Sequence, residues 1–397
     1  MEFTYSLEKL KYNKDANSGR EYQQCALSVM DTISDPNIRF DEKGICNYYY
    51  EYKKTIESFN LYDNDYKKKT FDELISKIKN DSKGKKYDCI LGLSGGVDST
   101  YLCILAKENG LNPLVVHFDN GWNSELAQNN IENILNITGF DLYTYVVDWE
   151  EFKELQLSYL KASVVDIEVL TDHAFMAVLY SQARKWNIKY VLAGMNYVTE
   201  FVLPSNWIYN KGDLQNIINI QNKFGKIKFN DLKTYPFLKQ ETAFYCNRIL
   251  KMEVISLLNY IDYSYDNIKN LLIAKYNWKD YGGKHFESIF TRFYQGYILP
   301  CKFNIDKRKA HFSNLIFSEQ ITKNIALEWL ETTPYDLKLM KDDYDFVIKK
   351  FNLTEQDFIK IMKAQRVEHI YYGTQPKLLE KYKFLSLLNH INKKLKK

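Results

Sequence analysis

The residues with the clearest chemical potential form one short stretch, Ser94-Gly95-Gly96-Val97-Asp98-Ser99-Thr100. An apolar run precedes it and a helical pattern follows, which predicts a turn between a strand and a helix. Two glycines let the backbone bend tightly, and N–H groups at such a turn and at a helix start attract anions. The hydroxyl groups add hydrogen bonds, and the Asp98 carboxylate can position Mg²⁺ or hold the turn. The stretch is therefore typical of a pyrophosphate cradle.

Two other phosphate-binding motifs do not fit this stretch. The Walker loop requires GxxxxGK[ST] and the dinucleotide fingerprint requires GxGxxG, and the stretch contains neither. A tight turn with a helix cap and no ligand is the alternative interpretation, because Ser and Asp favour such positions. The strand–turn–helix context favours phosphate binding.

The elements around the stretch alternate in type. Short apolar runs predict strands at residues 87–93, 112–119, 141–148 and 188–194. Helical spacing predicts helices at residues 66–80, 97–110, 123–139, 150–162 and 171–187. This alternation predicts the α/β class, with a Rossmann-like parallel sheet covered by helices on both faces.

The patterns change on either side of this region. Residues 21–60 show turn signals around short apolar pieces, which predicts a small irregular module. Beyond about residue 205 strand signals fade, and helices are expected at 211–224, 240–258, 319–331, 336–351, 354–365 and 376–394. We therefore divide the chain into an N-terminal module (1–60), an α/β domain (61–205) and a mostly helical region (206–397).

Composition excludes several classes of protein. The chain has 397 residues and a formal charge of +4, too mild to indicate a nucleic-acid binder. No apolar run reaches the length of a membrane span, and the N-terminus lacks the apolar core of a signal peptide. Six cysteines are too few for a disulfide scaffold. We expect a cytoplasmic protein that binds neither nucleic acid nor membrane.

The glycine-rich stretch resembles the PP-loop of the N-type ATP pyrophosphatases, which adenylate a carbonyl oxygen or a similar group and release pyrophosphate. The resemblance implies that ATP, with its Mg²⁺, lies across the carboxyl ends of the strands. The nucleotide-binding residues that it implies are Leu93, Ser94, Gly95, Gly96, Asp98, Ser99, Thr100, His117, Phe118, Asp119 and Gly194.

Further segments resemble one family of this superfamily, the N-acetyl sugar amidotransferases of bacterial surface-glycan synthesis. They are residues 30–47, 91–100, 117–127, 168–174, 192–200, 281–300 and 302–316. The resemblance implies conversion of an acetamido group to an acetamidino group on a nucleotide-linked or nonulosonic sugar, of the pseudaminic or legionaminic type. AMP is transferred to the amide oxygen, ammonia attacks the resulting O-adenylyl imidate, and AMP leaves. The products serve O-antigen, capsule or flagellin glycans.

The resemblance also guides the choice of site residues. The catalytic candidates are Ser94, Asp98, Ser99, Asp172, His173 and Lys302. The substrate-binding candidates are Trp122, Asn196, Glu200, Lys284, His285, Glu287, Arg292, Lys307, Arg308 and His311. A solvated basic face is the alternative for the lysines and arginines, and we favour it only for Lys309. A histidine–carboxylate pair would deprotonate ammonium or the substrate amide, and the sequence leaves the pair undecided.

The chain departs from the family in its cysteines. Members often carry two CxxC pairs, whereas Cys25 and Cys46 here each lack the second cysteine. Two cysteines alone are a poor structural zinc site, so we expect no zinc and no other bound metal beyond the Mg²⁺ of the nucleotide. No cysteine has the setting of a glutaminase nucleophile. Ammonia is therefore expected free or from a separate glutaminase subunit, and the oligomeric state is left open.

Three alternatives remain. A tRNA-thiolating enzyme would need a persulfide-carrying cysteine near the nucleotide and a strongly basic face. Another amide-forming ligase would predict a fused or tightly bound glutaminase. A non-catalytic nucleotide-binding protein would not need the complete SGGVDST stretch that this chain retains.

Overall fold

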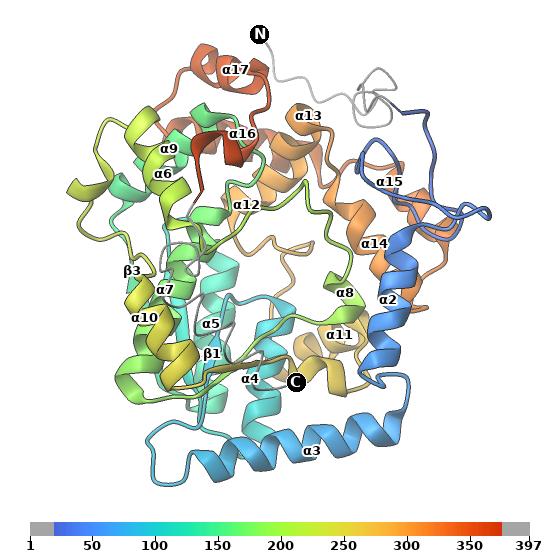
Figure 1. The fold of residues 1–397 in the computed structure, drawn as a ribbon, viewed down its shortest axis with the longest axis vertical. Helices are drawn as coiled ribbons and strands as arrows, with labels where there is room; N and C mark the ends of the chain where they lie inside the picture. The colour runs from blue at the N-terminus through green and yellow to red at the C-terminus, as the bar shows by residue number, and fades with distance from the viewer. Residues whose placement is uncertain (1–19, 375–397) are drawn as a thin grey trace, which may run out of the picture.

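The centre of the protein is a five-stranded sheet, seen in a computed structural model that describes residues 20–374 (Figure 1). The strands are β1 (Ile90–Gly92), β2 (Leu114–Asp119), β3 (Leu142–Val146), β4 (Tyr190–Leu192) and β5 (Glu253–Ile255). Their order is β3-β2-β1-β4-β5, and all neighbouring pairs are parallel. The predicted α/β class and the four predicted strands are confirmed. Strand order reverses between β1 and β4, which opens a crevice at their carboxyl ends.

The first half of the chain supplies most of the helices that cover the sheet. They are α2 (Asn47–Ser58), α3 (Asn64–Asp81), α4 (Val97–Glu108), α5 (Glu125–Thr138), α6 (Trp149–Ala162) and α7 (Val169–Trp186). The capping chemistry matches the sequence: Ser124 accepts a hydrogen bond from the Ala127 N–H group, and Gly139 ends α5 at a φ of 70°. The helices predicted between residues 66 and 187 are confirmed.

The helix predicted at residues 240–258 is wrong. The segment contains α10 (Gln240–Phe244), a π-helical turn η2 (Tyr245–Ile249), β5 and the start of the 3₁₀ helix η3 (Leu257–Tyr260). Lys251 has a φ of 52°, which interrupts the helix, and the Glu253 N–H group then donates to the Lys189 carbonyl (2.9 Å). A three-residue edge strand is too short to leave a periodic pattern. The sheet thus takes one strand from beyond the boundary drawn at residue 205.

The second half of the chain is mostly helical. Its elements are α8 (Tyr197–Glu200), α9 (Leu214–Phe224), η1 (Phe229–Asp231), α11 (Tyr265–Tyr276), α12 (Ile289–Phe293), η4 (Tyr294–Ile298), α13 (Leu299–Phe303), α14 (Lys307–Phe317), α15 (Lys323–Leu330), α16 (Leu337–Lys350), α17 (Glu355–Lys363) and η5 (His369–Tyr372). Four helices expected here are confirmed as α9, α15, α16 and α17, whereas α11 to α14 were not predicted. The helix expected at 376–394 lies outside the described residues.

A short backbone pairing joins the helical region to the sheet. Asn123, in the loop after β2, forms an antiparallel bridge with Ser288. The Ser124 N–H group donates to the Glu287 carbonyl (2.8 Å), and the Ile289 N–H group donates to the Trp122 carbonyl (2.9 Å). This pairing holds the segment before α12 at the carboxyl edge of the sheet.

The N-terminal module is irregular only in its first part. Residues 20–46 contain no helix or extended strand, and their only bridges are Gln24↔Asp31 and Phe40↔Cys46. Residues 47–58 form α2 instead of continuing the irregular chain. The module docks on α14, where Lys309 pairs with buried Asp31. Between residues 20 and 374, no helix is both long and apolar enough to cross a membrane.

Candidate active site

The glycine-rich loop lies between β1 and α4 and is held by contacts on two sides. Gly95 has a φ of 84°, and a Cβ atom there would lie 2.7 Å from the Ala127 carbonyl oxygen of α5. The Trp278 indole N–H group donates to the Gly95 carbonyl (3.0 Å). Only glycine fits a position that combines a left-handed backbone with so close a neighbour. The loop conformation is therefore fixed before any ligand arrives.

The loop leaves a buried hydroxyl and the start of α4 without side-chain partners. The Thr100 hydroxyl is buried and makes no hydrogen bond with the described residues. Helix α4 begins without a side-chain cap, so N–H groups of its first turn are unpaired by side chains. The Ser94 and Ser99 hydroxyls are 3.2 Å apart. Free donors at a helix start beside a tight glycine turn fit a phosphate chain, and these residues would hold one.

A lysine and two carboxylates lie at the start of α4. The Lys284 ammonium is 2.9 Å from Glu200 Oε1 and 3.7 Å from Asp98 Oδ2. Burial disfavours its charge, but Glu200 and Asp98 outweigh burial and raise the pKa of Lys284. Burial also raises the pKa of Asp98, and Lys284 opposes the rise. The Tyr263 hydroxyl donates a hydrogen bond to Asp98 Oδ1, and the Asn196 amide nitrogen lies 3.4 Å from the same oxygen.

Two histidines extend this group. His285 Nδ1 lies 3.8 Å from Glu287 Oε1, while Glu287 Oε2 is buried and makes no hydrogen bond with the described residues. Burial opposes the charge on Glu287, yet its bond to His285 and the charge of His285 lower the pKa of Glu287. His311 Nδ1 is 3.4 Å from the Thr199 carbonyl. Burial, followed by the charge of Lys284, lowers the pKa of His311 to about 3, so this ring is neutral.

The glycine-rich loop faces the charged group of Lys284, Glu200 and Glu287. A Cβ atom at Gly96 would lie 3.3 Å from the Tyr281 hydroxyl and 3.6 Å from Glu287 Oε1. A Cβ atom at Gly194, after β4, would lie 3.5 Å from the Asp98 Cβ atom. The structure therefore brings together most of the candidates chosen from four separate segments. They are Ser94, Gly95, Gly96, Asp98, Ser99, Thr100, Gly194, Asn196, Glu200, Lys284, His285, Glu287 and His311.

The end of β2 carries a second set of candidates. His117 Nδ1 lies 2.8 Å from the Leu93 carbonyl, and the Asn123 amide is 2.9 Å from His117 Nε2. Asp119 accepts hydrogen bonds from the Gly121 N–H group (2.9 Å) and from Asn123 (3.3 Å). These bonds stabilise the loop after β2 and occupy the carbonyl of Leu93, one of the predicted nucleotide-binding residues.

Two aromatic candidates on this side are core residues. Phe118 is buried against Tyr145 and Phe152. Trp122 is 1% exposed and donates its indole N–H to Gln156 (2.7 Å). Trp122 is therefore a residue of the hydrophobic core and does not face a substrate.

Two basic candidates, Lys302 and Arg308, have partners away from the loop. The Lys302 ammonium, on α13, donates to the Ile361 carbonyl of α17, and burial lowers its pKa to about 8. In Figure 1, α13 and α17 lie at the end of the molecule opposite α3, and α4 lies between these two ends. Arg308 pairs with Asp306 (2.7 Å) and donates to the Thr332 carbonyl (2.9 Å).

Arg292 and His173 also have partners within the protein. Arg292 forms a buried bidentate pair with Asp343 of α16 (2.7 and 2.8 Å). His173 Nδ1 lies 2.7 Å from the Lys211 carbonyl, and its Nε2 accepts the Leu238 N–H group (3.1 Å). Both ring nitrogens of His173 are thus engaged by backbone, which suits a structural histidine.

The remaining candidates belong to a second charged group next to the first. Asp172 pairs with Lys211 (3.0 Å), which also binds Asp166 (2.7 Å). Lys307 lies near these carboxylates, and burial lowers its pKa. Glu168, which immediately precedes α7, completes the group.

Sequence reasoning missed several residues of the site. Tyr281 stands directly before the Gly-Gly-Lys-His segment, so its neighbours in the sequence were a usable signal. Trp278 and Tyr263 had none, because aromatic residues abound in this chain, with 32 tyrosines among them. Glu168 lies inside a family-like segment but was overlooked beside Asp172.

The two cysteines of the N-terminal module are close together. The Cys46 N–H group donates to Cys25 Sγ (3.3 Å), and the Ser28 hydroxyl lies 3.9 Å from Cys46 Sγ. The hydrogen bond from the Cys46 thiol, more than the one from its N–H group, lowers the pKa of Cys25 to about 5. In the described part of the chain, no group of three or more His, Cys, Asp or Glu residues is placed to hold a metal ion.

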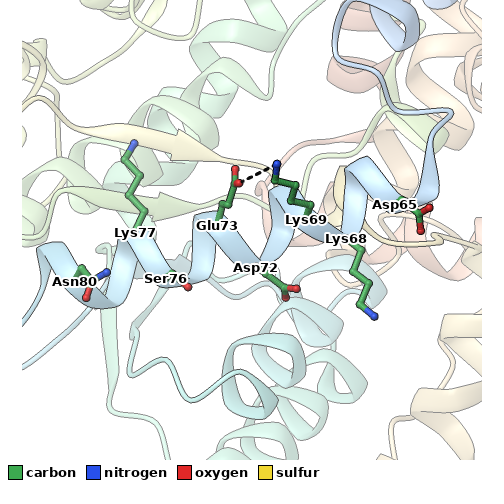
Figure 2. A pocket seen from close by; sticks show the side chains of 8 residues that line it. All are labelled: Asp65, Lys68, Lys69, Asp72, Glu73, Ser76, Lys77 and Asn80. Carbon is green, nitrogen blue, oxygen red and sulfur yellow. Dashed lines mark ion pairs between the residues drawn. The ribbon is translucent and has the colours of Figure 1, made fainter.

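Figure 2 shows a surface hollow elsewhere on the molecule. All eight lining residues belong to α3, from Asp65 to Asn80, and Lys69 and Glu73 form an i,i+4 pair there. Exposed pairs of this kind contribute little to stability. One polar helix face lines the hollow, which is separate from the glycine-rich loop.

Comparisons with known proteins agree with the sequence resemblance. Residues 287–387 match the family model of the LPS biosynthesis protein WbpG-like C-terminal domain, about a quarter of the chain. This segment runs from Glu287 of the site through α14 and beyond. The expected likeness to a surface-glycan family is thereby confirmed for this domain.

Two curated proteins share shorter stretches. A 116-residue stretch is 34% identical to an uncharacterized protein of Methanocaldococcus jannaschii and covers 29% of this chain and 38% of that protein. A 76-residue stretch is 40% identical to tRNA(Ile)-lysidine synthase of Chlamydia pneumoniae and covers 18% of this chain and 23% of that protein. The chain thus spans less than half the length of either relative.

Solved structures show only a distant likeness. NMN synthetase from Francisella tularensis has a TM-score of 0.27 and 17% identity, over 53% of this chain and 87% of that one. NH3-dependent NAD synthetase from Campylobacter jejuni has a TM-score of 0.29 and 15% identity, over 54% and 86%. Scores this low support no inference, and the parallel sheet of this chain is established by its own strand pairing.

Proposed function

We propose that this protein is an ATP-dependent amidotransferase that converts an acetamido group of a sugar to an acetamidino group, in the synthesis of a bacterial surface glycan. The observation that carries the proposal is the position of Lys284, which lies 3.7 Å from Asp98 of the SGGVDST loop and pairs with Glu200 (2.9 Å). The match of residues 287–387 to a lipopolysaccharide-biosynthesis domain supports a sugar substrate.

The site has the parts that such a reaction requires. ATP, with Mg²⁺, would place its phosphates at the loop, where the Thr100 hydroxyl lacks a partner and α4 begins without a side-chain cap. Fixed donors of this kind stabilise the charge that develops on leaving pyrophosphate. Lys284 adds a cation beside the loop, and Glu200 and Asp98 keep that amine charged. The sugar amide would approach from the side of Asn196 and His285.

In the proposed reaction, the amide oxygen attacks the α-phosphorus, the bond to pyrophosphate breaks, the amide nitrogen gives up its proton to solvent, and an O-adenylyl imidate forms. Ammonia attacks the imidate carbon, and AMP leaves with the electrons of the broken C–O bond. We propose that ammonia arrives free or from a separate glutaminase subunit. The sugar is a nucleotide-linked diacetamido sugar or a nonulosonic acid.

One assay tests the reaction and its substrate together. The protein is incubated with ATP, Mg²⁺, an ammonium salt, and a panel of CMP-linked nonulosonic acids and UDP-linked diacetamido sugars. The reaction replaces the carbonyl oxygen by an NH group, which lowers the sugar mass by about one dalton. We expect this shift only with ATP, and AMP only with sugar.

Variants of the loop provide the matched test. Ser99→Ala and Asp98→Asn should abolish sugar-dependent pyrophosphate release while circular dichroism stays unchanged. Asp345→Asn, in an exposed pair on α16, serves as a control that removes a carboxylate without touching the site. Full turnover by both loop variants, or no AMP with any sugar, would contradict the proposal and favour a thiolating enzyme or a non-catalytic nucleotide-binding protein.

A further inference from the structure

A second charged group, here called the Glu168 cluster, consists of Asp166, Glu168, Asp172, Lys211 and Lys307. Four of its members come from the segment that leads into α7, from α7 itself and from the start of α14; Lys211 precedes α9. Helices that lead back into a parallel strand begin at the carboxyl edge of the sheet, so the start of α7 lies at the edge that holds the glycine-rich loop.

Two connections place this cluster next to the candidate active site. Lys307 and His311 are four residues apart on α14, hence on one face and about 6 Å apart along the axis. The Thr291 hydroxyl donates to Glu168 Oε1 (3.3 Å) and lies 3.0 Å from the Ser288 hydroxyl. Ser288 adjoins Glu287, which contacts the loop. The cluster therefore begins one helical turn from the site.

Among the described residues, Glu168 is the carboxyl of the cluster that forms no ion pair with an ammonium group, and its Oε1 accepts only the Thr291 hydroxyl. Both oxygens of Asp166 accept from Lys211 (2.9 and 2.7 Å), and Asp172 pairs with the same ammonium (3.0 Å). Two carboxylates and the ammonium groups of Lys211 and Lys307 balance in charge. Ionised Glu168 then gives the cluster one net negative charge, which attracts a small cation.

The surroundings of Glu168 suit proton transfer near neutral pH. Burial, followed by the charge of Asp172, raises the pKa of Glu168 to about 7, and Lys211 and Lys307 oppose the rise. The buried Tyr294 hydroxyl also faces the cluster, where it donates to the Val165 carbonyl. A group that is half protonated at the working pH exchanges protons most effectively.

We infer that the Glu168 cluster binds ammonium and that Glu168 is the base that takes its proton, an inference that rests on the proposed function. One proton passes from ammonium to the Glu168 carboxylate, which leaves neutral ammonia with a free lone pair. That lone pair forms the new C–N bond, and AMP leaves with the electrons of the C–O bond. Two protons stay on the new nitrogen, one passes to the sugar nitrogen, and Glu168 later releases its own to water.

The test separates adenylation from attack by ammonia. Sugar-dependent exchange of labelled pyrophosphate into ATP, measured without ammonium, reports adenylation alone. Amidine formation, measured by mass, reports both steps. We expect Glu168→Gln to keep the exchange within about threefold of the unchanged protein and to lower amidine formation by about 10²–10⁴-fold, the usual contribution of a general base.

The pH profile gives a second readout that a structural role would not change. Amidine formation by the unchanged protein should rise through about pH 7 as Glu168 ionises. Glu168→Gln should lose this rise and recover at alkaline pH, where ammonium deprotonates without help. Glu168→Asp keeps a carboxyl and should retain the rise with a lower rate. Asp345→Asn should match the unchanged protein in both assays.

Each other result overturns the inference. Equal amidine formation by Glu168→Gln, or a loss of exchange together with product in a folded variant, excludes Glu168 as the base. If Glu168→Gln does not fold, a Glu168→Asp variant without the rise through pH 7 excludes it. If the unchanged protein shows no sugar-dependent exchange, the proposed function itself fails, and the role of Glu168 fails with it.

Discussion

Arg292 allows a sharp test, because two incompatible roles predict different effects of its replacement. The resemblance to a sugar amidotransferase assigns it to the substrate. In the structure its guanidinium, 9% exposed, forms a bidentate pair with Asp343, 5% exposed. The same guanidinium lies 5.7 Å from the Phe286 ring centroid. This geometry predicts that Arg292 joins α12 to α16 and does not touch a ligand.

The expected magnitude follows from the burial of the pair. Arg292→Met leaves Asp343 charged and uncompensated in the interior, which costs about 3–5 kcal/mol. A domain of 150–250 residues loses about 2–4 °C in Tm per kcal/mol, so Tm should fall by roughly 6–20 °C. The double variant Arg292→Met with Asp343→Leu removes both charges. It should recover most of this loss, because an apolar replacement of a whole buried pair is often neutral.

The assay combines calorimetry with steady-state kinetics well below the lowered Tm. We expect the KM for ATP and for the sugar to stay within twofold in the single and the double variant. Lys341→Met, in an exposed pair with Asp345 on α16, is the matched control and should leave Tm unchanged. An unchanged Tm together with a KM raised in both variants would refute the structural role and restore Arg292 to the substrate site.

Three further predictions concern the loop and Glu168. Gly95→Ala should abolish pyrophosphate release, because its Cβ atom would meet the Ala127 carbonyl at 2.7 Å; Gly139→Ala, also at positive φ but with no neighbour within 4 Å, controls for backbone strain alone. Trp278→Phe removes one hydrogen bond to the loop, worth about 1 kcal/mol, and should raise the KM for ATP about fivefold. An unchanged KM would show that the loop keeps its conformation without this hydrogen bond. The pKa of Glu168 is raised from 4.5 to about 7, so its ionisation lowers the stability of the fold as pH rises through this window. The free energy of unfolding in urea should therefore be about 3 kcal/mol higher for Glu168→Gln than for the unchanged protein at pH 8.5, and equal at pH 4.

The parts of the fold that could be predicted are those with a local cause. The strand–loop–helix unit around Gly95 needs only an apolar run, two glycines and a helical pattern, all within 25 residues. Strands β1, β2 and β4 are mostly buried apolar runs between helices and are visible for the same reason, whereas β3 is a half-exposed edge strand. Strand β5 has no such signal, because its three residues are ordered by the neighbouring edge of β4.

The site shows the same division between local and long-range causes. Chain position suggested Asp98 and Gly194 as neighbours, and the structure places them side by side, since both follow strands whose carboxyl ends meet in one crevice. Chain position could not show that Glu200 and Asp98, which precede Lys284 by 84 and 186 residues, would keep its ammonium group charged. That arrangement depends on the bridge between Asn123 and Ser288.

Basic residues illustrate most clearly why the type of a side chain does not determine its role. Lys302, Arg308 and Lys284 all lie in segments that resemble the same family, and all carry the charge that a phosphate would attract. The first two have partners on α17 and on the turn after α15, whereas Lys284 alone faces the loop. A buried cation binds whichever acceptor the fold brings within reach, and desolvation penalises any that is left unpaired. The role of each cation therefore depends on the acceptors that surround it in space. Lys284 pairs with Glu200 (2.9 Å) and lies 3.7 Å from Asp98 of the loop, so it is the cation of the three that is placed to meet the phosphates of the proposed nucleotide.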